Sequence, residues 1–285
     1  MKKFYLVTNW RKPMAAEKAA YIRQYLEERD CTCYQETEGQ AQPGISYKYT
    51  DASGVPEDVE CVITLGGDGT LIQAARDLAG RNLPLLGINL GTLGYLTQVG
   101  KEEEIATMLD DLIADRYQLE QRMMLDGKAY HKGVRSFSDV ALNEIVITRR
   151  DLLQVLTFYI YINGEYLNQY KADGMIIATP TGSTAYNLSA GGPIVAPTAS
   201  ITILTPICPH TLNSRSVVFS AGDHIRIEIA GEESRGPVAV FDGDTTTELY
   251  AGDYIDIGKA EIQTTLVKLK NISFLDNLRN KMAGI

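Results

Sequence analysis

The chain has 285 residues, and its 27 Lys and Arg against 36 Asp and Glu give a formal net charge of −9. With 45% hydrophobic and 22% charged residues, the composition is typical of a soluble globular protein with one large or two ordinary domains, and it excludes a disordered chain. The acidic balance argues against a nucleic-acid or anionic-membrane surface, because phosphate backbones are bound by clustered Lys and Arg.

The four cysteines and three histidines are scattered and do not show the paired spacing of a zinc site. The apolar run near the start is too short for a signal peptide, and no stretch approaches the roughly 20 apolar residues that span a bilayer. A few thiols without a dense disulfide framework suit a reducing compartment. We therefore expect a cytoplasmic protein.

Short apolar runs alternate with helix-like segments in the first third of the chain. The expected strands are 4–8, 61–65 and 84–89, the expected helices are 15–29, 71–79 and 102–112, and 36–56 is expected to be loop. Strands that alternate with helices predict a parallel sheet with helices on its faces. We assign residues 1–113 to an α/β domain of this kind.

Short strand-like runs with turn signals between them follow the last of these helices. Strands are expected at 117–125, 140–148, 155–162, 175–179, 201–204, 217–220, 224–229, 238–242, 254–257 and 262–268. Asn163-Gly164, between two apolar runs, predicts a two-residue hairpin. The pattern predicts a β-rich, sandwich-like domain over 114–268, followed by a C-terminal helix or tail over 269–285 with a helix at 274–282.

The most informative short motif lies between an expected strand and an expected helix and consists of Gly66, Gly67, Asp68, Gly69 and Thr70. Glycines let a ligand approach the main chain, and N–H groups at a helix start attract anions. A carboxylate inside such a loop suggests that Asp68 takes a proton from an attacking hydroxyl or holds a metal that bridges phosphates. The alternative is a simple turn in which Asp68 or Thr70 caps the helix. The spacing matches neither a P-loop nor G-x-G-x-x-G.

Asn143 and Glu144 lie inside an apolar segment that is expected to be buried. A buried carboxylate needs a partner, which can be a protein cation, a backbone donor or a ligand hydroxyl. Neighbouring side chains of a regular strand point to opposite faces, so both can reach one ligand only at a strand end or a bulge. A purely structural pairing of Glu144 is the alternative.

The longest informative stretch runs from Lys171 to Pro193 and is rich in hydroxyl residues after an apolar strand. Hydroxyls at a helix start can donate to phosphate or ribose oxygens, and Tyr186 adds an aromatic face. We favour a ligand site over a helix that is merely well capped. A Ser-His-Asp hydrolase is not expected, because the chain has no G-x-S-x-G motif.

Taken together, these stretches resemble the NAD kinase family. The matching segments are LGGDGT (65–70), GINLGTLGYL (87–96), ALNEIVI (141–147), DGMIIATPTGSTAYNLSAGGPI (173–194), CPHTLNSRS (208–216) and FDGD (241–244). The resemblance implies phosphorylation of the 2′-hydroxyl of the adenosine ribose of NAD, which gives NADP, with ATP or polyphosphate as donor. It also implies Mg²⁺ bound through phosphates without a protein metal site, and assembly as a homodimer or homotetramer.

The resemblance carries over to individual positions. Asp68 matches the family's proposed catalytic base. The positions that match NAD contacts are Asp68, Gly69, Asn143, Glu144, Asp173, Thr184, Ala185, Tyr186, Asn187, Leu188 and Ser189, and Lys171 matches a commonly basic contact position. Asp244 stands where the family often has Gln, which adds negative charge near the expected dinucleotide site and bears on NAD affinity and on the choice between NAD and NADH.

Two other functions share part of this pattern. A kinase of another alcohol, such as a lipid or a sugar, can carry the same Gly-Gly-Asp-Gly loop. A non-catalytic NAD(P) sensor would keep the dinucleotide contacts without turnover. The intact loop around Asp68 disfavours the sensor, and the hydroxyl-rich stretch at 179–189 disfavours a lipid kinase.

Overall fold

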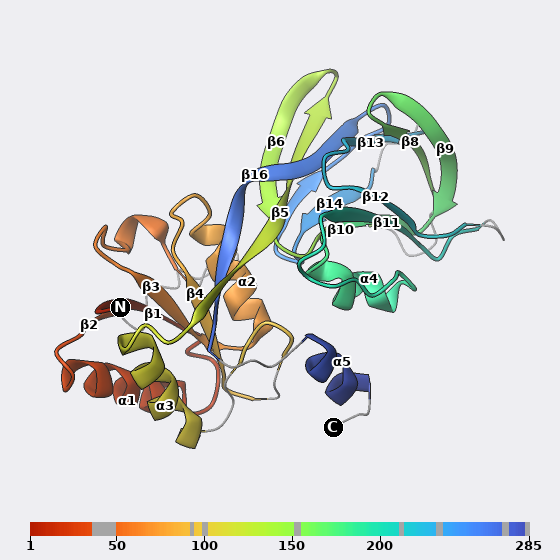
Figure 1. The fold of residues 1–285 in the computed structure, drawn as a ribbon. Coiled ribbons are helices and arrows are strands. Elements are labelled where there is room, and N and C mark those ends of the chain that lie inside the picture. Colours follow the sequence, from red (N-terminus) through yellow and green to blue (C-terminus); the bar gives the residue numbers. More distant parts are fainter. Residues whose placement is uncertain are drawn as a thin grey trace. The chain divides into compact units, whose positions relative to one another are not determined.

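The structure is a computed structural model that describes residues 1–35, 50–91, 94–98, 102–150, 155–210, 214–231, 236–269 and 274–282. The chain divides into two compact units, one made of Met1–Gln121 and Gln263–Ile285 and the other of Arg122–Ile262. Two strands, β5 (Gln118–His131) and β16 (Tyr254–Lys268), have residues in both units (Figure 1). The sequence-based boundary between residues 113 and 114 stays a prediction.

The first unit is built on a parallel sheet. Its remaining elements are β1 (Lys3–Thr8), α1 (Ala15–Glu27), β2 (Thr32–Gln35), η1 (Ala52–Gly54), β3 (Cys61–Gly66), α2 (Asp68–Asp77), β4 (Leu85–Asn89), α3 (Glu102–Ile113) and α5 (Phe274–Met282). β1 pairs in parallel with β2 and β3, β3 pairs in parallel with β4, and the end of β16 pairs in parallel with β4. The predicted parallel sheet with flanking helices is confirmed.

α1 and α3 pack on the sheet of the first unit through their apolar sides. Ala15, Ala19, Ile22 and Leu26 recur every three or four residues on α1 and are buried. They pack with residues of α3 and of β1, β3 and β4 in one hydrophobic cluster, and Figure 1 shows α1 and α3 together at this sheet. Leu71 of α2 lies instead beside Gly87 of β4, where a Cβ would come within 2.8 Å of the leucine methyl group.

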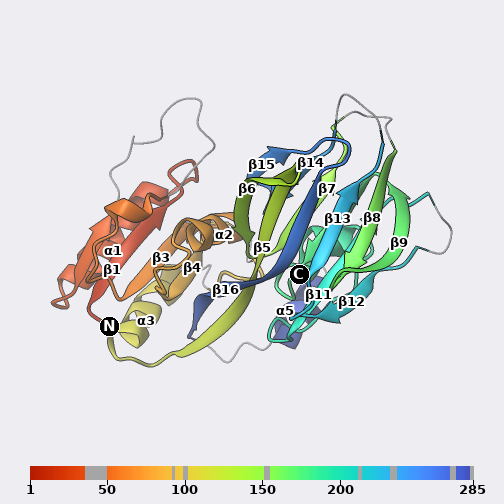
Figure 2. The same cartoon turned by 90° about the horizontal axis from the view of Figure 1, so that it is seen from above.

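The second unit consists of two antiparallel sheets. Its elements besides β5 and β16 are β6 (Val134–Ala141), β7 (Glu144–Thr148), β8 (Leu156–Ile162), β9 (Glu165–Ala172), β10 (Gly174–Ala178), η2 (Gly182–Thr184), α4 (Tyr186–Ser189), β11 (Ile201–Ile207), β12 (Val217–Ser220), β13 (Ile225–Ile229), β14 (Val238–Phe241) and β15 (Thr245–Glu248). One sheet has the order β12-β11-β10-β7-β14-β15, and the other contains β16-β13-β8-β9 with β5 and β6 (Figure 2).

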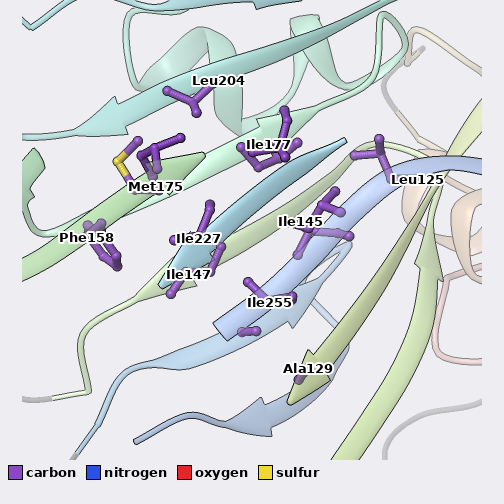
Figure 3. Packing of buried hydrophobic residues seen from close by; sticks show 14 of the residues in the cluster. Leu125, Ala129, Ile145, Ile147, Phe158, Met175, Ile177, Leu204, Ile227 and Ile255 are labelled. Atoms are coloured by element: carbon purple, nitrogen blue, oxygen red, sulfur yellow. The ribbon is translucent and has the colours of Figure 1, made fainter. Parts of the chain in front are cut away.

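The core of this unit lies between the two sheets. Figure 3 shows Met175, Ile177 and Leu204, from β10 and β11 of one sheet, packed in a cluster with side chains of the other sheet such as Phe158 and Ile227. All five are fully buried. Each such side chain contributes about 1.5–3 kcal/mol relative to its exposure in water. The predicted β-rich, sandwich-like domain is thus confirmed.

Several predicted boundaries differ from the structure. The single strand expected over 140–148 is two strands, β6 and β7, separated at Leu142 and Asn143. The helix expected from Leu71 begins three residues earlier, at Asp68. β16 is continuous where two strands were expected. Gly258 lies within the strand, and a Cβ there would come within 2.8 Å of the His224 ring.

Three strand segments carried too little pattern to be predicted. β2 is a short edge strand, β15 alternates only half-buried and exposed residues, and most of β6 is exposed or half-buried. The loop expected over 36–56 falls outside the described residues for 36–49. Within the parts of the chain that the structure describes, no helix combines the length and the apolarity needed to cross a bilayer. α5 coincides with the helix predicted at the C-terminal end.

The turn between β8 and β9 provides a test of the predicted hairpin. Asn163 and Gly164 have φ values of 51° and 84°, as a two-residue type I′ turn requires. We expect Gly164→Ala to destabilise the chain by about 1–2 kcal/mol, because a Cβ is disfavoured at positive φ. Urea unfolding should show this loss, whereas Gly222→Ala, at another turn of the same unit and without positive φ, should stay within about 0.5 kcal/mol of the parent.

Candidate active site

The carboxylate of Asp68 is held by a loop that follows β4. Gly67, with extended backbone, precedes the first residue of α2, and Asp68 is that residue. Its Oδ2 accepts the N–H of Tyr95 at 2.7 Å, and its Oδ1 accepts the N–H groups of Leu96 and Thr97 at 3.2 and 3.1 Å and the Thr97 hydroxyl at 3.1 Å. Four donors therefore fix a half-exposed carboxylate in one orientation.

This geometry tests the interpretation of the motif as a simple helix cap. The hydrogen bonds of Asp68 run to another loop, and no side chain caps α2, so the capping alternative is wrong for Asp68. Thr97 also accepts a hydrogen bond from the Asn89 amide at 3.1 Å, which ties the loop to the end of β4. Gly94 is required there, because a Cβ at this position would collide with the Asp68 carboxylate.

The four remaining residues of the motif serve different purposes. Thr70 is buried against Gly66, where a Cβ would overlap its side chain. A Cβ on Gly67 or Gly69 would meet no atom within 4 Å. Packing within the protein therefore does not require these two glycines, and their missing side chains leave the main chain open to close approach by a ligand.

In the second unit, Asn143 and Glu144 lie at the break between β6 and β7. The backbone N–H groups of Leu142, Asn143 and Glu144 donate to the Asp242 carboxylate at 2.6, 2.8 and 3.0 Å. A carboxylate thus takes donors that a strand partner would otherwise use. The expectation that both residues need a strand end to reach one ligand is met, since Glu144 is the first residue of β7.

The segment after β10 also forms hydrogen bonds with the backbone of residues 142 and 143, between β6 and β7. The Thr179 hydroxyl donates to the Leu142 carbonyl at 2.6 Å, and the Thr179 N–H donates to the Asn143 carbonyl at 2.8 Å. Gly182 lies so close to Asn143 that a Cβ would overlap its carbonyl. The backbone of Asn143 is therefore fixed by hydrogen bonds on both sides.

Glu144 is a buried carboxyl group whose Oε2 has no hydrogen-bond partner within the described part of the chain. The residue is 7% exposed. Burial, and secondly the nearby Asp242 carboxylate, raise the pKa of Glu144 to about 8. Of the partners expected from the sequence, neither a protein cation nor a backbone donor of the described residues reaches Oε2.

Most hydroxyls of the stretch after β10 bond to the protein itself. Ser183 donates to the Pro180 carbonyl at 2.7 Å, Thr184 donates to the Thr181 carbonyl at 3.4 Å, and Thr181 accepts from Arg122 at 3.2 Å. These side chains stabilise the loop and η2. They are not extended toward a ligand in this structure.

The positions from 184 to 189 differ widely in accessibility. Asn187 is fully buried: its amide nitrogen donates to Ser183 and Pro193, and its oxygen accepts from Thr205 at 2.7 Å. Its side chain therefore holds α4 in place. Tyr186 and Leu188 are exposed, as is Ser189, while Thr184 and Ala185 are half-buried.

The structure does not bring Asp173 and Lys171 beside Glu144. Glu144 pairs with Ala178 at the end of β10, whereas Asp173 directly precedes the start of that five-residue strand, roughly 15 Å away along the sheet. The Asp173 carboxylate pairs with Arg149 at 2.9 Å, with His210 at 3.9 Å, and Lys171 is exposed on β9. A ligand that contacts both groups has to extend along β10.

Asp242 is the site residue that the sequence interpretation missed. The Asp242-Gly243-Asp244 segment is the predicted turn, with φ values of 50° and 73° at its first two residues, and it joins β14 to β15. The Asp244 N–H closes this turn on the Phe241 carbonyl at 3.0 Å. A carboxylate beside a Gly at a turn was the available signal, but nothing in the sequence connects it to residues 142–144.

No three His, Cys, Asp or Glu side chains gather into a possible metal site among the residues that the structure describes. Three of the carboxylates discussed above are separately occupied: Asp68 by four donors, Asp242 by three backbone N–H groups and Asp173 by Arg149. These residues do not by themselves fit a protein-held divalent cation.

Asp242 can be tested through stability. Asp242→Asn removes the charge and turns a donor toward three N–H groups, so we expect a loss of about 2–4 kcal/mol in the free energy of unfolding. Urea denaturation measures this loss. Glu248→Gln on β15 affects an exposed pair with Arg150 and a hydrogen bond from the Tyr250 hydroxyl, and it should cost less than about 1 kcal/mol; similar losses for both variants would contradict the anchoring role.

Glu144 should make stability depend on pH. Between the ordinary pKa of 4.5 and about 8, the folded chain keeps a proton that the unfolded chain releases, so this group lowers stability as the pH rises. Relative to Glu144→Gln, the parent should therefore lose up to about 1.4 kcal/mol per pH unit in this window and then level off. Urea unfolding of both ligand-free proteins across this range tests it, and parallel curves would show that the group does not titrate as described.

Comparison with known families covers most of the chain. Residues 4–117 match the model of the ATP-NAD kinase N-terminal domain, and residues 142–269 match that of the ATP-NAD kinase C-terminal domain. The NAD kinase of Lachnospira eligens is 46% identical, in an alignment that covers 99% of this chain and 100% of that protein. The NAD kinase of Thermoanaerobacter pseudethanolicus is 39% identical, with 99% of both chains covered.

Solved structures agree with this assignment. Yeast NADH kinase complexed with NADH matches with a TM-score of 0.85 and 26% identity, over 100% of this chain and 88% of that one. An NAD kinase from Archaeoglobus fulgidus in complex with ATP matches with a TM-score of 0.76 and 25% identity, over 100% of both chains. The held carboxylate after β3, the anchored Asn-Glu turn and these matches lead to one conclusion: the chain belongs to the NAD kinase family.

Proposed function

We propose that this chain transfers a phosphoryl group from ATP to the 2′-hydroxyl of the adenosine ribose of NAD, giving NADP. The observation that carries the proposal is the carboxylate of Asp68, fixed by four donors at the end of β3, in a chain that matches both domains of the family. The relatives of solved structure support both substrate classes, since the yeast enzyme was solved with NADH and the Archaeoglobus enzyme with ATP.

In this proposal Asp68 is the general base. Among the residues that the structure describes, its Oδ1 accepts three hydrogen bonds and Oδ2 accepts one, from the Tyr95 N–H, so Oδ2 keeps a lone pair for the substrate hydroxyl. The ribose oxygen forms a bond to the γ-phosphorus as the bond to the β-phosphate oxygen breaks, ADP leaves, and the hydroxyl proton passes to Asp68. A positioned base of this kind contributes about 10²- to 10⁴-fold.

The dinucleotide contacts are proposed for the second unit. Glu144, with a buried Oε2 that lacks a partner, would bind a ribose hydroxyl, and the half-exposed Asn143 beside it would add an amide. Tyr186 and Ser189, exposed one turn apart on α4, would add a ring face and a hydroxyl. For Asn187 the proposal is a supporting role, because its amide is already fully bonded.

Lys171, Asp173 and Asp244 belong to the proposal as further contacts. Asp173, held by Arg149, would contact the end of the dinucleotide that lies away from Glu144. Asp244 adds a negative charge near the turn that Asp242 anchors, so we expect it to influence the choice between NAD and NADH. Contacts of Thr184, Ala185 and Leu188 also stay proposals.

The proposed Mg²⁺ would be bound through phosphate oxygens of the donor, where it would neutralise charge; no step above depends on a metal held by the protein. A homodimer or homotetramer and a cytoplasmic location complete the proposal. Polyphosphate is the second possible donor.

Asp68→Asn tests the central step. The amide keeps the shape but accepts no proton, so we expect kcat to fall about 10²- to 10⁴-fold while NAD still binds. NADP formation from NAD, Mg²⁺ and ATP measures turnover, and calorimetry measures NAD binding.

Asp58→Asn is the matched control, an exposed carboxylate of the same unit that pairs with Lys3 at 2.6 Å, and it should leave kcat unchanged. Near-normal turnover of Asp68→Asn would refute the base assignment. A parent protein that binds NAD but forms no NADP with any donor would instead be a sensor, and phosphorylation of a lipid or sugar in place of NAD would identify another alcohol kinase.

A further inference from the structure

The strand order of the first unit places a topological switch point beside Asp68. The order is β2-β1-β3-β4, so the chain leaves β1 toward β2 on one side and returns to β3 on the other. Ligands of open α/β sheets bind outside the carboxyl ends of the strands at such a point. β1 ends at Thr8 and β3 at Gly66, and the two segments that leave the sheet there are 9–14 and the loop that leads into Asp68.

Hydrogen bonds hold the turn after β1 against the motif that carries Asp68. The N–H of Asn9 donates to the Leu65 carbonyl at 2.9 Å, and the Asn9 amide donates to the Thr70 hydroxyl at 3.4 Å. The Asn9 side-chain oxygen accepts the N–H of Arg11 at 3.2 Å. Asn9 therefore fixes the turn and places the backbone of Arg11 next to the motif that carries Asp68.

The turn leads into a helix start that suits an anion. α1 has 13 residues, its N-cap Met14 has a φ of 63°, and no side chain caps its first N–H groups. Such groups carry partial positive charge. Arg11 and Lys12 are exposed in the turn itself, and Lys18, 7% exposed, adds a positive charge just after the first turn of the helix.

Thr8 supplies an independent sign of a ligand. It is 4% exposed, and its hydroxyl has no hydrogen-bond partner among the residues that the structure describes. Phe4 and Leu6 pack in one cluster with Ala19 and Ile22 of α1, so alternation along β1 places Thr8 on this same face, at the end of the strand where α1 begins. A buried hydroxyl without a partner is costly, and an anion oxygen at the helix start would satisfy it.

The charged residues of this site indicate the chemical class of its ligand. Of the residues that the structure describes in the segments following β1, β3 and β4 up to the next helix or to Gln98, Arg11 and Lys12 are the cationic ones. The chain is acidic overall, and the motif after β3 carries the acidic residue Asp68. A phosphate chain brought to Asp68 needs local cations, and the turn after β1 is where this unit provides them.

We infer that the turn after β1, with Thr8, Arg11, Lys12 and the start of α1, binds the phosphate chain of the phosphoryl donor. The inference rests on the proposed function and adds the donor's binding residues to it. The shared ligand chemistry is a run of linked phosphates, carried either by a nucleoside triphosphate or by inorganic polyphosphate.

Thr8→Val provides the sharpest test, because valine keeps the shape and removes only the hydroxyl. We expect the KM for ATP to rise about tenfold, with the KM for NAD unchanged and the melting temperature equal to or above that of the parent. Arg11→Ala and Lys12→Ala should raise the KM for ATP by a similar factor. Thr202→Val, the same change at a second buried hydroxyl without a partner, in β11 of the other unit, should leave both KM values unchanged.

Inorganic triphosphate gives a readout that needs no turnover. It should raise the melting temperature of the parent and of Thr202→Val, and raise it clearly less for Thr8→Val and Arg11→Ala. The melting temperature with triphosphate still tests the inference if the parent forms no NADP. Absence of NADP formation would refute the proposed function but not the inferred phosphate site.

The donor series completes the test. Equal rises in the KM for ATP and for polyphosphate support a site for the phosphate chain. A rise for ATP alone would mean that these residues bind the nucleoside, and it would overturn the inference. Unchanged KM values together with undiminished stabilisation by triphosphate would also overturn the inference, as would a rise in the KM for NAD as large as that for the donor.

Discussion

The hydrogen bonds between the Asp242 carboxylate and three successive N–H groups determine how the second unit presents its polar side chains. Residues 142–144 donate to this carboxylate in place of a strand partner, at the point where β6 ends and β7 begins. Glu144 becomes the first residue of a strand, with one carboxyl oxygen buried and without a partner. The polar turn therefore exists at the expense of regular pairing, and the turn between β14 and β15 supplies the carboxylate that compensates for it.

In the first unit, the Asp68 carboxylate also accepts hydrogen bonds from successive backbone N–H groups. There the catalytic candidate is itself the carboxylate that accepts backbone N–H groups, from Tyr95, Leu96 and Thr97. The hydrogen bonds order a loop that follows β4 and fix the orientation of the carboxylate before a substrate binds. Such preorganisation lowers the cost of positioning a base against a weak nucleophile. Gly94 allows the approach, because any side chain there would collide with Asp68.

The hydroxyl-rich stretch shows where residue types alone mislead. Its composition predicted donors for a ligand, yet Thr179, Ser183 and Thr184 bond to main-chain carbonyls of the protein. The side-chain amide of Asn187 likewise bonds to the protein itself, through hydrogen bonds with Ser183, Pro193 and Thr205. A hydroxyl or an amide can satisfy a loop as well as a ligand. Only the positions of the acceptors distinguish the two uses.

Local signals in the sequence determined the alternation of strands and helices in the first unit, the hairpin at Asn163-Gly164 and the requirement that Glu144 find an unusual partner. These depend on periodicity, on backbone conformations that Asn and Gly favour, and on the cost of burying charge, all of which act between near neighbours or on one residue. The tertiary structure decided that Asp242 anchors residues 142–144, that Asp68 bonds to residues 95–97, and that the turn after β1 meets the motif after β3. Each of these joins segments far apart in the chain, and no local pattern specifies which distant donor meets which acceptor, because that choice is made when the sheets assemble.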